Sequence, residues 1–376
     1  MPNLPENIQI AVREKNDKRA VLFVNELLGK HIPVSPSRVR KCFHKFAGLV
    51  SEFIETNYPD AGKKKSPILL IGFAETATAL SKSLYDDLSD DFQIDYACTT
   101  REERLGQELG IPPIVRFKEE HSHAPEHLLY FLGDLSKYKY FLLVDDEMST
   151  GNTARNLWNA LQATGQLRED AHFVPVCLAL NEKVLGTREL DGITMQTVPP
   201  HDEIVLPEIK DYSELVKVYT GELPEGEEVP PLLTEMDDKL KAFEQVKSYE
   251  LGQKQRNVLV IGTEENMCGP LRFAYLFEKL DEQCKIKRRI RLQATTRTPI
   301  IPQSRADNID YPLFRRAELP SFYDPERVTY IYNLMKFEIV FVFACSDEET
   351  SRPARIALYK ALKERGCEDI VFIDED

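Results

Sequence analysis

The residues best suited to chemistry lie in one stretch, residues 142–153, with the sequence LLVDDEMSTGNT. An apolar run there ends in two acids, Asp145 and Asp146, and a loop of small hydroxyl residues follows. Backbone N–H groups that gather at the start of a helix favour a phosphate, and Gly151 lets the chain approach it closely. The two carboxylates can accept hydrogen bonds from sugar hydroxyls. The stretch therefore predicts a site for a ribose 5-phosphate; the alternative is a capped helix beside two solvated acids.

The elements that must position this stretch follow from the pattern of apolar residues. We expect strands at 67–71, 94–98, 140–144, 173–178 and 193–198, and helices at 37–58, 74–88 and 153–163. Continuous apolar strands that alternate with helices are typical of a mostly parallel sheet covered on both faces. Ligands of such sheets bind at the carboxyl ends of the strands, where Asp145 and Asp146 stand.

The same pattern starts again later in the chain. Strands are expected at 257–261, 290–294, 339–345 and 370–373, and helices at 237–249, 271–280 and 351–365. An acidic, Pro-rich stretch (221–239) precedes them and is too polar to bury much surface. We therefore expect a first α/β domain at 1–220, a linker and helix at 221–255, and a smaller Rossmann-like α/β domain at 256–376. The alternative for the acidic stretch is a long loop within one domain.

Composition and charge limit the class of protein. The chain has 376 residues, is 42% hydrophobic and carries a formal net charge of −14. This acidity argues against a general binder of nucleic acid or of membrane surfaces, because both need a basic face. No apolar run approaches the ~20 residues that cross a bilayer, and we expect no signal peptide. Seven cysteines without a CxxC pair suit a reduced, cytoplasmic chain.

The run at 142–153 resembles the phosphoribosyl-pyrophosphate (PRPP) signature of type I phosphoribosyltransferases, in which apolar residues precede two acids and a Thr/Ser-Gly-Thr loop. The resemblance implies the parallel sheet of that family, with helices on both faces, and contacts of Asp145 and Asp146 with the ribose 2′- and 3′-hydroxyls. The residues implied for the 5-phosphate are Ser149, Thr150, Gly151, Asn152 and Thr153. Mg²⁺ would be held by PRPP and water rather than by direct protein ligands, and a homodimer is expected.

A closer resemblance covers most of the chain. Residues 23–36 (FVNELLGKHIPVSP), 72–78 (GFAETAT) and 119–124 (EEHSHA) are similar to an orotate-phosphoribosyltransferase-like family of bacterial tellurite-resistance and stress gene clusters. Residues 261–270 (IGTEENMCGP) and 296–299 (TRTP) are similar to its companion domain, named TRSP after a Thr-Arg-Ser-Pro run. The resemblance implies synthesis of a nucleoside-like metabolite. It also implies that residues 28–31 lie near the hood over the acceptor, unless they form a structural edge strand and turn.

In the related enzymes, the loop after the first strand of the sheet holds the pyrophosphate of PRPP. Ala74, Glu75 and Thr76 occupy that position here. Glu75 is unusual, because a carboxylate beside pyrophosphate costs energy unless Mg²⁺ bridges them or the side chain turns elsewhere; the alternative is that it caps the next helix. Arg101, with Arg104, is expected to neutralise the departing pyrophosphate, or else to belong to a solvated charged turn.

The charged stretch 116–127 (RFKEEHSHAPEH) is expected to be the mobile loop that closes over the substrate in these enzymes. His121 and His123 are candidates to donate or accept a proton near neutral pH. Lys118 is a candidate to steady the leaving group. Two alternatives stay open, namely a metal site in which His127 joins the other two histidines, and a plain exposed loop.

The second domain carries candidates of its own. Thr295 and Arg297 follow a strand and could bind an anion, and Glu264 lies in the loop after the first strand of that domain. Residues 99–101 and 295–297 both read Thr-Thr-Arg after a short apolar run. The repeat is explained by chance or by a similar strand-end loop in the two halves.

These features predict an enzyme, a Mg²⁺-dependent pentosyltransferase that moves ribose 5-phosphate from PRPP to a base-like acceptor and releases pyrophosphate. Two other classes of protein stay open. One is a non-catalytic sensor of PRPP or a nucleotide, and the other is a hydrolase or lyase that cleaves a nucleotide-like compound. Neither nucleic acid nor a membrane is expected as a partner.

Overall fold

The computed structural model describes residues 4–14, 20–62, 65–103, 106, 110–118, 126–182, 192–248, 256–344 and 347–374. The chain divides into two compact units. The first unit comprises Met1–Pro5 and Arg40–Ile204, and the second comprises Glu6–Val39 and Val205–Asp376.

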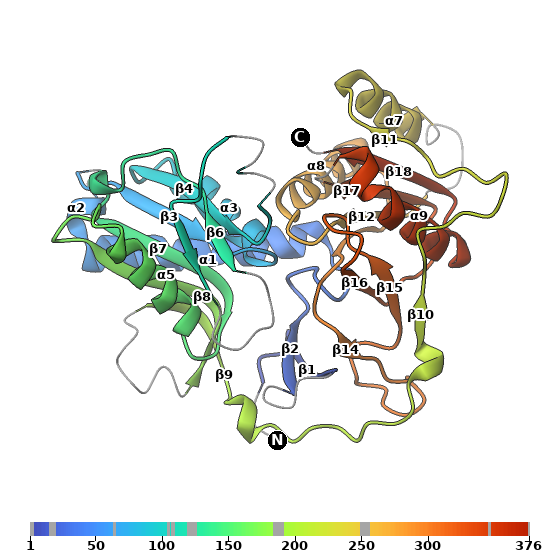
Figure 1. The fold of residues 1–376 in the computed structure, drawn as a ribbon, viewed down its shortest axis with the longest axis horizontal. Coiled ribbons are helices and arrows are strands. Elements are labelled where there is room, and N and C mark those ends of the chain that lie inside the picture. Colours follow the sequence, from blue (N-terminus) through green and yellow to red (C-terminus); the bar gives the residue numbers. More distant parts are fainter. Residues whose placement is uncertain are drawn as a thin grey trace. The chain divides into compact units, whose positions relative to one another are not determined.

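The first unit is built around a seven-stranded sheet with the strand order β5-β6-β4-β3-β7-β8-β9 (Figure 1). Its elements are α1 (Pro36–Asn57, whose first residues belong to the second unit), α2 (Pro59–Gly62), β3 (Ile68–Gly72), α3 (Ala77–Leu88), β4 (Ile94–Thr100), β5 (Val115–Phe117), β6 (His127–Leu129), β7 (Tyr140–Met148), α5 (Asn152–Ala163), β8 (His172–Asn181) and β9 (Ile193–Val198). The strands from β4 to β9 in this order run parallel, whereas β6 pairs antiparallel with both β4 and β5.

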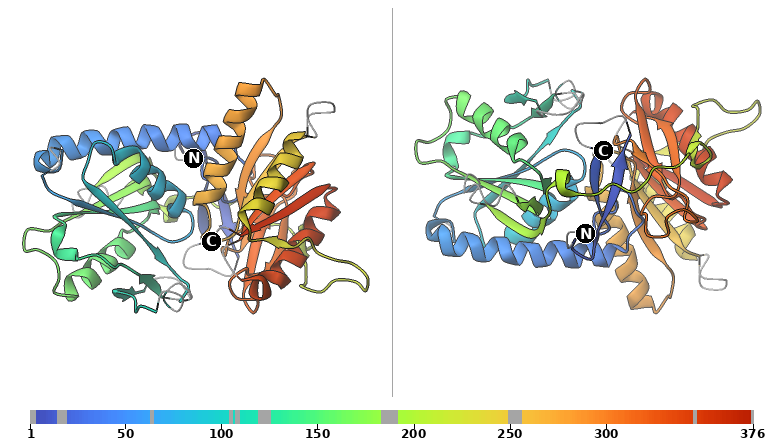
Figure 2. Two further views of the ribbon diagram at one scale, coloured as in Figure 1. Left: turned by 90° about the horizontal axis from the view of Figure 1, so that it is seen from above. Right: turned by 90° about the horizontal axis from the view of Figure 1, so that it is seen from below.

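Helices cover both faces of this sheet (Figure 2). The β3–α3–β4 and β7–α5–β8 crossovers run toward opposite edges of the sheet, so right-handed connections place α3 and α5 on opposite faces. Every residue of β3 is buried, because a central parallel strand packs against helices on both sides. The expected α/β fold, a mostly parallel sheet between two layers of helices, is confirmed.

The second unit contains a parallel five-stranded sheet with the order β11-β18-β17-β12-β13. Its elements are β1 (Ile8–Arg13), β2 (Val21–Asn25), β10 (Val216–Val218), β11 (Leu232–Leu233), α7 (Met236–Ser248), β12 (Val258–Gly262), α8 (Cys268–Cys284), β13 (Ile290–Ala294), β14 (Ile300–Ile301), β15 (Arg316–Pro320), β16 (Val328–Tyr332), β17 (Ile339–Ala344), α9 (Glu348–Glu364) and β18 (Asp369–Asp374). Two small sheets, β14-β1-β2 and β10-β15-β16, complete the unit.

The N-terminal segment belongs to the second unit, which differs from the boundaries expected from sequence. β1 pairs with β2 and with β14, and the turn that follows is hydrogen bonded to β13. Ala294 N donates to Gly29 O (2.9 Å), and Val34 N donates to Leu292 O (3.0 Å). These contacts make residues 28–31 a turn that is hydrogen bonded to β13 of the second unit, and their place near an acceptor hood stays a prediction. With this segment included, the second unit is the larger of the two rather than the smaller.

The acidic stretch 221–239 is a surface segment within the second unit and not a linker between domains. β10 pairs with β15 just before it, and β11 pairs with β18 at the edge of the main sheet. Lys360 Nζ donates to Glu222 O (3.0 Å), and Arg355 Nη1 donates to Pro230 O (3.2 Å). The composition keeps the segment at the surface, but its carbonyl groups find cationic partners on α9. The unit boundary accordingly falls before Val205 instead of before residue 221.

Two elements extend further than the sequence predicts. β7 continues through Asp145 and Asp146 to Met148, because β8 stays paired with it as far as Leu180. α9 begins at Glu348, and neither Thr350 nor Ser351 is its cap. Asp347 is the cap instead, since its side chain accepts the N–H of Thr350 (2.8 Å).

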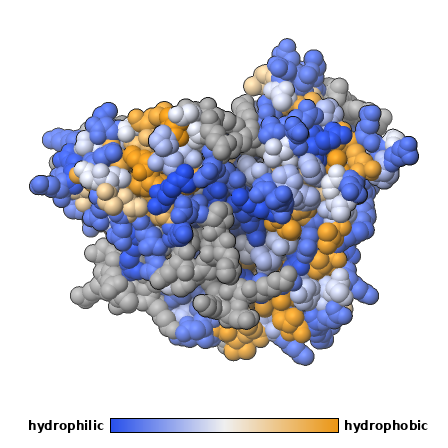
Figure 3. Space-filling view, viewed as in Figure 1, coloured by the Kyte–Doolittle hydropathy of each residue, from blue (hydrophilic) through white to orange (hydrophobic). Residues whose placement is uncertain are grey.

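On the face shown in Figure 3, hydrophilic residues predominate and apolar residues lie in separate groups. Among the described residues, no helix is both long and apolar enough to span a membrane. The six cysteines in the described part of the chain are free thiols.

Gly72 ends β3 at the point where α3 packs most closely. A Cβ built there would lie 2.0 Å from Ser81 Oγ, so Gly72→Ala must displace the helix. We expect a loss of about 1–3 kcal/mol in the free energy of unfolding, measured by urea denaturation. Gly48→Ala is the matched control, because that position in α1 has open space; alanine should add about 0.5–1 kcal/mol there. Equal effects of the two substitutions would refute the close packing.

Candidate functional site

The two adjacent acids lie at the end of β7, beyond the end of β3. The pairing of the two strands ends with Gly72 opposite Val144, and Phe73 N donates to Val144 O (3.0 Å). β7 then continues with β8 alone, so Asp145 and Asp146 stand on a two-stranded extension at the carboxyl edge of the sheet. Both residues are half-buried, and Asp145 Oδ1 accepts the N–H of Asp146 (2.9 Å).

The loop after β7 leads directly into α5. Gly151 has a φ of 71° and is the N-cap of the helix, where no side chain forms a capping hydrogen bond. The N–H groups of the first turn and the positive end of the helix dipole therefore face this loop. Arg155 braces it, because its Nη1 donates to Thr150 O (3.1 Å) and to Asn152 Oδ1 (2.8 Å). Such a loop is suited to hold a phosphate. The hydroxyl residues that keep part of their surface exposed there are Ser149, Thr150 and Thr153.

The loop between β3 and α3 contains an ion pair shielded from water. Arg101 Nη1 lies 2.7 Å from Glu75 Oε1, and the two side chains are only 12% and 9% exposed. Glu75 has a φ of 63°, a left-handed backbone that residues other than glycine rarely adopt. The Glu75 carboxylate binds Arg101 and does not cap α3. Thr76 is the N-cap of that helix, without a side-chain capping bond. Arg101 is likewise not in a solvated turn, because its guanidinium is committed to Glu75.

Thr99 and His127 extend this ion pair into a network. Thr99 Oγ1 accepts the N–H of Ala74 (3.0 Å) and lies 3.2 Å from His127 Nδ1. Arg101 Nε donates to His127 Nε2 (3.3 Å). His127 is 1% exposed, so it supports Arg101 and Thr99 from within the unit. Across the ranges that the structure describes, no group of His, Cys, Asp and Glu could hold a metal ion; two of the three histidines of the alternative metal site, His121 and His123, lie outside those ranges.

The residues predicted on the charged loop are only partly within the described chain. Lys118 is exposed, and its Nζ lies 3.8 Å from Glu126 Oε1. Its carbonyl accepts a hydrogen bond from Asn156 Nδ2 (2.9 Å), which joins the start of the loop to α5. His121 and His123 lie outside the described residues.

Sequence reasoning missed a second acid–histidine contact beside the two aspartates. Glu147 Oε1 lies 3.1 Å from His201 Nε2, and both side chains are largely buried. Glu147 shares one side of β7 with Asp145, because side chains repeat every two residues along a strand. His201 begins the short 3₁₀ helix η3 (His201–Glu203) after β9. The run Asp-Asp-Glu could have drawn attention to Glu147, but no pattern in the sequence brings His201 to it.

Cys177 lies in β8 opposite Asp145. Burial, together with the nearby carboxylates of Asp145 and Glu147, raises the pKa of its thiol to about 12. The thiol therefore stays protonated near neutral pH and is not a nucleophile of this site.

The three candidates of the second unit come together at the ends of β12 and β13. Glu264 is 2% exposed, and its Oε2 accepts a hydrogen bond from Arg297 Nε (2.7 Å). Its Oε1 accepts from Ser321 Oγ (2.7 Å) and from Phe322 N (2.9 Å). Thr295 Oγ1 accepts the N–H of Glu264 (2.9 Å). The contacts place all three at the carboxyl edge of the parallel sheet.

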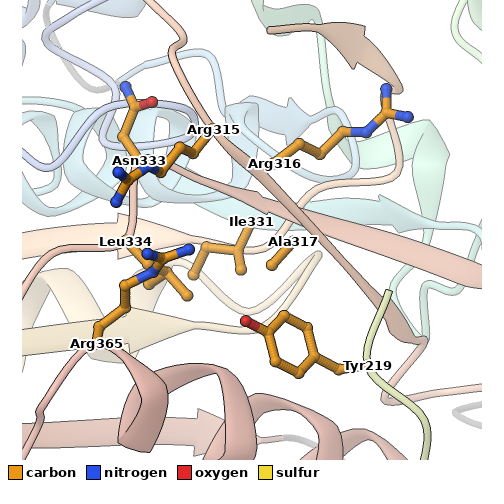
Figure 4. A pocket seen from close by; sticks show the side chains of 8 residues that line it. All are labelled: Tyr219, Arg315, Arg316, Ala317, Ile331, Asn333, Leu334 and Arg365. Carbon is orange, nitrogen blue, oxygen red and sulfur yellow. The ribbon is translucent and has the colours of Figure 1, made fainter. Parts of the chain in front are cut away.

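A cavity elsewhere in the second unit is too small to hold a metabolite (Figure 4). Its volume is about 10 Å³, which is room for about one water molecule. The residues that line it are Tyr219, Arg315, Arg316, Ala317, Ile331, Asn333, Leu334 and Arg365. Arg316 is committed to other partners, since Nη1 lies 2.6 Å from Glu14 Oε2 and Nη2 lies 2.6 Å from Glu318 Oε1. The ends of the parallel strands are therefore the better candidates for a site.

The Glu75–Arg101 pair should act as a unit in stability measurements. Arg101→Leu leaves the Glu75 carboxylate buried without its partner, and we expect it to lower the free energy of unfolding by about 3–5 kcal/mol. The double variant with Glu75→Gln should lose markedly less than the sum of the two single changes, because the stranded charge is gone. Urea denaturation of the four proteins gives the coupling energy. Additivity within about 0.5 kcal/mol would show that the two groups do not interact.

Comparisons with known proteins find a family for each of two parts of the chain. Residues 8–188 match a family described as phosphoribosyl transferase. Residues 232–362 match a second family, described as the TRSP domain C-terminal to it. No curated protein matches the chain.

Several solved structures are similar to parts of the chain. A hypoxanthine phosphoribosyltransferase from Staphylococcus aureus is 11% identical, with 46% of this chain and 78% of that chain covered and a TM-score of 0.29. An adenine phosphoribosyltransferase from Thermoanaerobacter pseudethanolicus is 11% identical, with 51% and 96% covered and a TM-score of 0.35. The two family matches follow one another along the sequence. Residues 8–188 are thus similar to a phosphoribosyltransferase family, and residues 232–362 are similar to the TRSP domain that accompanies it.

Proposed function

We propose that the protein is a Mg²⁺-dependent transferase that moves ribose 5-phosphate from PRPP to a base-like acceptor. In this reaction the bond between ribose C1 and the pyrophosphate oxygen breaks, and its electron pair leaves with pyrophosphate. A nitrogen or carbon nucleophile of the acceptor forms the new bond to C1. The observation that carries the proposal is the extension of β7, which presents Asp145 and Asp146 a few residues before the start of α5, where Gly151 is the N-cap.

The two ends of the ribose 5-phosphate would meet two different parts of this extension. The N–H groups that follow Gly151 hold the 5-phosphate, because they are concentrated at the start of α5 and the N-cap glycine has no side chain to occupy them. The carboxylates of Asp145 and Asp146 accept hydrogen bonds from the 2′- and 3′-hydroxyls. Holding both ends fixes the position of C1, and the protein then works by positioning and by stabilising charge in the transition state.

Glu75 is compatible with a pyrophosphate beside it, because its charge is already compensated. Arg101 neutralises the carboxylate at 2.7 Å, so the loop around Ala74 and Thr76 presents little net negative charge to a polyanion. Arg101 is accordingly a positioning residue that acts through Glu75, and it takes this role in place of direct contact with the departing pyrophosphate. Lys118, His121 and His123 remain proposed contributors from the loop that would close over the substrate.

The donor set at the end of β7 suits Mg²⁺. Carboxylate oxygens are hard ligands, and Mg²⁺ is usually bound through one or two of them together with water and phosphate oxygens. Asp145 and Asp146 would hold it through water molecules, and the bound ion would supply positive charge against the pyrophosphate as it leaves. Direct coordination of the ion by protein side chains is not needed for this chemistry.

We also propose a class of product, a cellular location and an oligomeric state for the enzyme. It makes the product a nucleoside-like metabolite of the kind that the resemblance to tellurite-resistance and stress clusters implies, formed by a cytoplasmic homodimer. The support for these finer points is that resemblance, together with the free thiols of the described cysteines.

Replacing both Asp145 and Asp146 by Asn should weaken PRPP binding in the presence of Mg²⁺ by about 10- to 100-fold, because hydrogen bonds to charged groups are lost. Calorimetric titration measures the affinity, and pyrophosphate release with a panel of purine and pyrimidine bases measures turnover. Asp170→Asn is the matched control, since that exposed acid pairs with Arg168 near the start of β8, at the opposite edge of the sheet.

The outcomes separate the classes of protein. The transferase binds PRPP, releases pyrophosphate with one of the bases and loses both properties in the double variant but not in Asp170→Asn. A sensor binds PRPP without releasing pyrophosphate. A hydrolase or lyase cleaves nucleoside monophosphates when no pyrophosphate is present. Unchanged PRPP affinity in the double variant would overturn the assignment of the two acids.

A further inference from the structure

The two units share an arrangement of hydrogen bonds at the ends of neighbouring parallel strands. The run Thr-Thr-Arg stands at the end of β4 and directly after β13, the strands next to the central strands β3 and β12. The first threonine binds the loop that follows the central strand. Thr99 Oγ1 accepts the N–H of Ala74 (3.0 Å), and Thr295 Oγ1 accepts the N–H of Glu264 (2.9 Å). In each unit the donor is the second residue after the glycine that ends the central strand.

The other two residues of the run repeat their roles as well. Thr100 Oγ1 accepts the N–H of Glu102 (3.0 Å), and Thr296 Oγ1 accepts the N–H of Thr298 (3.3 Å). The arginine then binds a buried glutamate of the loop. The distance from guanidinium nitrogen to carboxylate oxygen is 2.7 Å both in the Arg101–Glu75 pair and in the Arg297–Glu264 pair.

Both glutamates share a backbone conformation that is unusual for their residue type. Glu75 has a φ of 63° and Glu264 a φ of 52°, and only Lys285 and Asn333 join them among the described residues other than glycine. The glutamate is the third residue after the glycine in the first unit and the second in the second unit, but the side-chain partners and the positive φ are shared, which indicates the same kind of loop in both units. This explains the Thr-Thr-Arg repeat in the sequence by a shared strand-end loop and not by chance.

This loop stands at the place where sheets of this kind bind ligands. β3 lies between β4 and β7, and β12 lies between β13 and β17. Later strands are therefore added on both sides of each central strand, so the strand order changes direction there. The loops at the carboxyl end of such a switch point form the ligand crevice of open α/β sheets. In the first unit this loop is the proposed pyrophosphate loop, and in the second unit it is residues 263–267.

Each loop also holds a buried polar atom that the protein leaves unsatisfied. Thr76 is 3% exposed and Asn266 is 7% exposed. Thr76 Oγ1 and Asn266 Nδ2 have no hydrogen-bond partner among the described residues. Leaving such a group unsatisfied costs free energy, and each stands within the residues that lead into the following helix, α3 or α8. A ligand oxygen would satisfy the amide of Asn266.

We propose that the second unit binds the phosphate group of a sugar phosphate or nucleotide at residues 263–268, between the end of β12 and the start of α8. Asn266 donates its amide to a phosphate oxygen. α8 adds the positive end of its dipole, since its N-cap, Met267, forms no side-chain capping bond. Arg297 neutralises Glu264, so the carboxylate does not repel the anion. This site is separate from the PRPP site and stands whether or not the proposed transferase activity does.

The proposal makes Asn266 a ligand contact and not a structural residue, and the two roles respond differently to substitution. Asn266→Leu replaces an unsatisfied amide with an apolar group of similar size, so the melting temperature without ligand should not fall. Calorimetric titration of the full-length protein with ribose 5-phosphate should show two equivalents for the wild type. Asn266→Leu should weaken one of them by about tenfold or more. Thr76→Val, the matching change in the first unit, should leave the ribose 5-phosphate affinity of the second-unit site unchanged.

A measurement on the unaltered protein covers the case in which Asn266→Leu does not fold. Cys268, half-buried, is the first residue of α8, and Cys284, exposed, is the last. Saturating ribose 5-phosphate should slow the alkylation of Cys268 several-fold and leave Cys284 unchanged, as read by mass spectrometry of the labelled peptides. The second thiol is thus an internal control on the same helix.

Failure of this site and failure of the PRPP site give different results. One equivalent that is lost with Asp145→Asn and Asp146→Asn but kept in Asn266→Leu overturns the second site alone. One equivalent that is lost in Asn266→Leu but kept in the double variant supports the second site and contradicts the first. No bound ribose 5-phosphate, or equal alkylation of Cys268 with and without it, overturns the proposal.

Discussion

A buried glutamate in a left-handed backbone, paired with an arginine that follows the neighbouring strand, fixes a loop at the end of the central strand in each unit. A residue other than glycine in that conformation costs about 1–3 kcal/mol, and an unpaired buried charge costs more. The ion pairs offset these costs at Glu75 and Glu264, because a guanidinium nitrogen of Arg101 or Arg297 lies 2.7 Å from the carboxylate oxygen. The same strand ends supply a threonine that accepts a loop N–H. The loop is therefore fixed before any ligand arrives, which is what a site that works by positioning needs.

The two ligand loops of the first unit reach a fixed shape by different means. The loop before α5 uses Gly151, which adopts a positive φ without a steric penalty, so it needs only light support from Arg155. The loop before α3 uses Glu75 and requires a partner from β4 and a histidine from β6. The glycine loop can approach a phosphate with its backbone alone, whereas the glutamate loop brings its own charge and its own neutralising cation. The charge around the proposed pyrophosphate position is thereby balanced within the protein.

The features that could be predicted from sequence are those that depend on residues adjacent in the chain. Buried parallel strands form continuous apolar runs, so β3, β7, β12 and β17 were predictable, and the acids and Ser/Thr/Gly residues of 142–153 stand next to one another. The features that were missed join residues far apart in the chain. The ion pair of Glu75 with Arg101 and the contact of Glu147 with His201 depend on which strands become neighbours. The N-terminal segment is linked to β13 of the second unit by backbone hydrogen bonds, which no pattern of side chains predicts.

The contacts of residues 296–299 explain why the second unit tolerates threonine where the TRSP name has serine. Arg297 uses its side chain on Glu264, and Thr296 uses its hydroxyl on the N–H of Thr298. Thr298, in contrast, is held in the described structure by its backbone, since its carbonyl accepts a hydrogen bond from Tyr332 Oη (2.7 Å). A change in that side chain leaves both hydrogen bonds intact. The run is thus a turn whose first two residues build the loop and whose third only has to continue the chain toward β14.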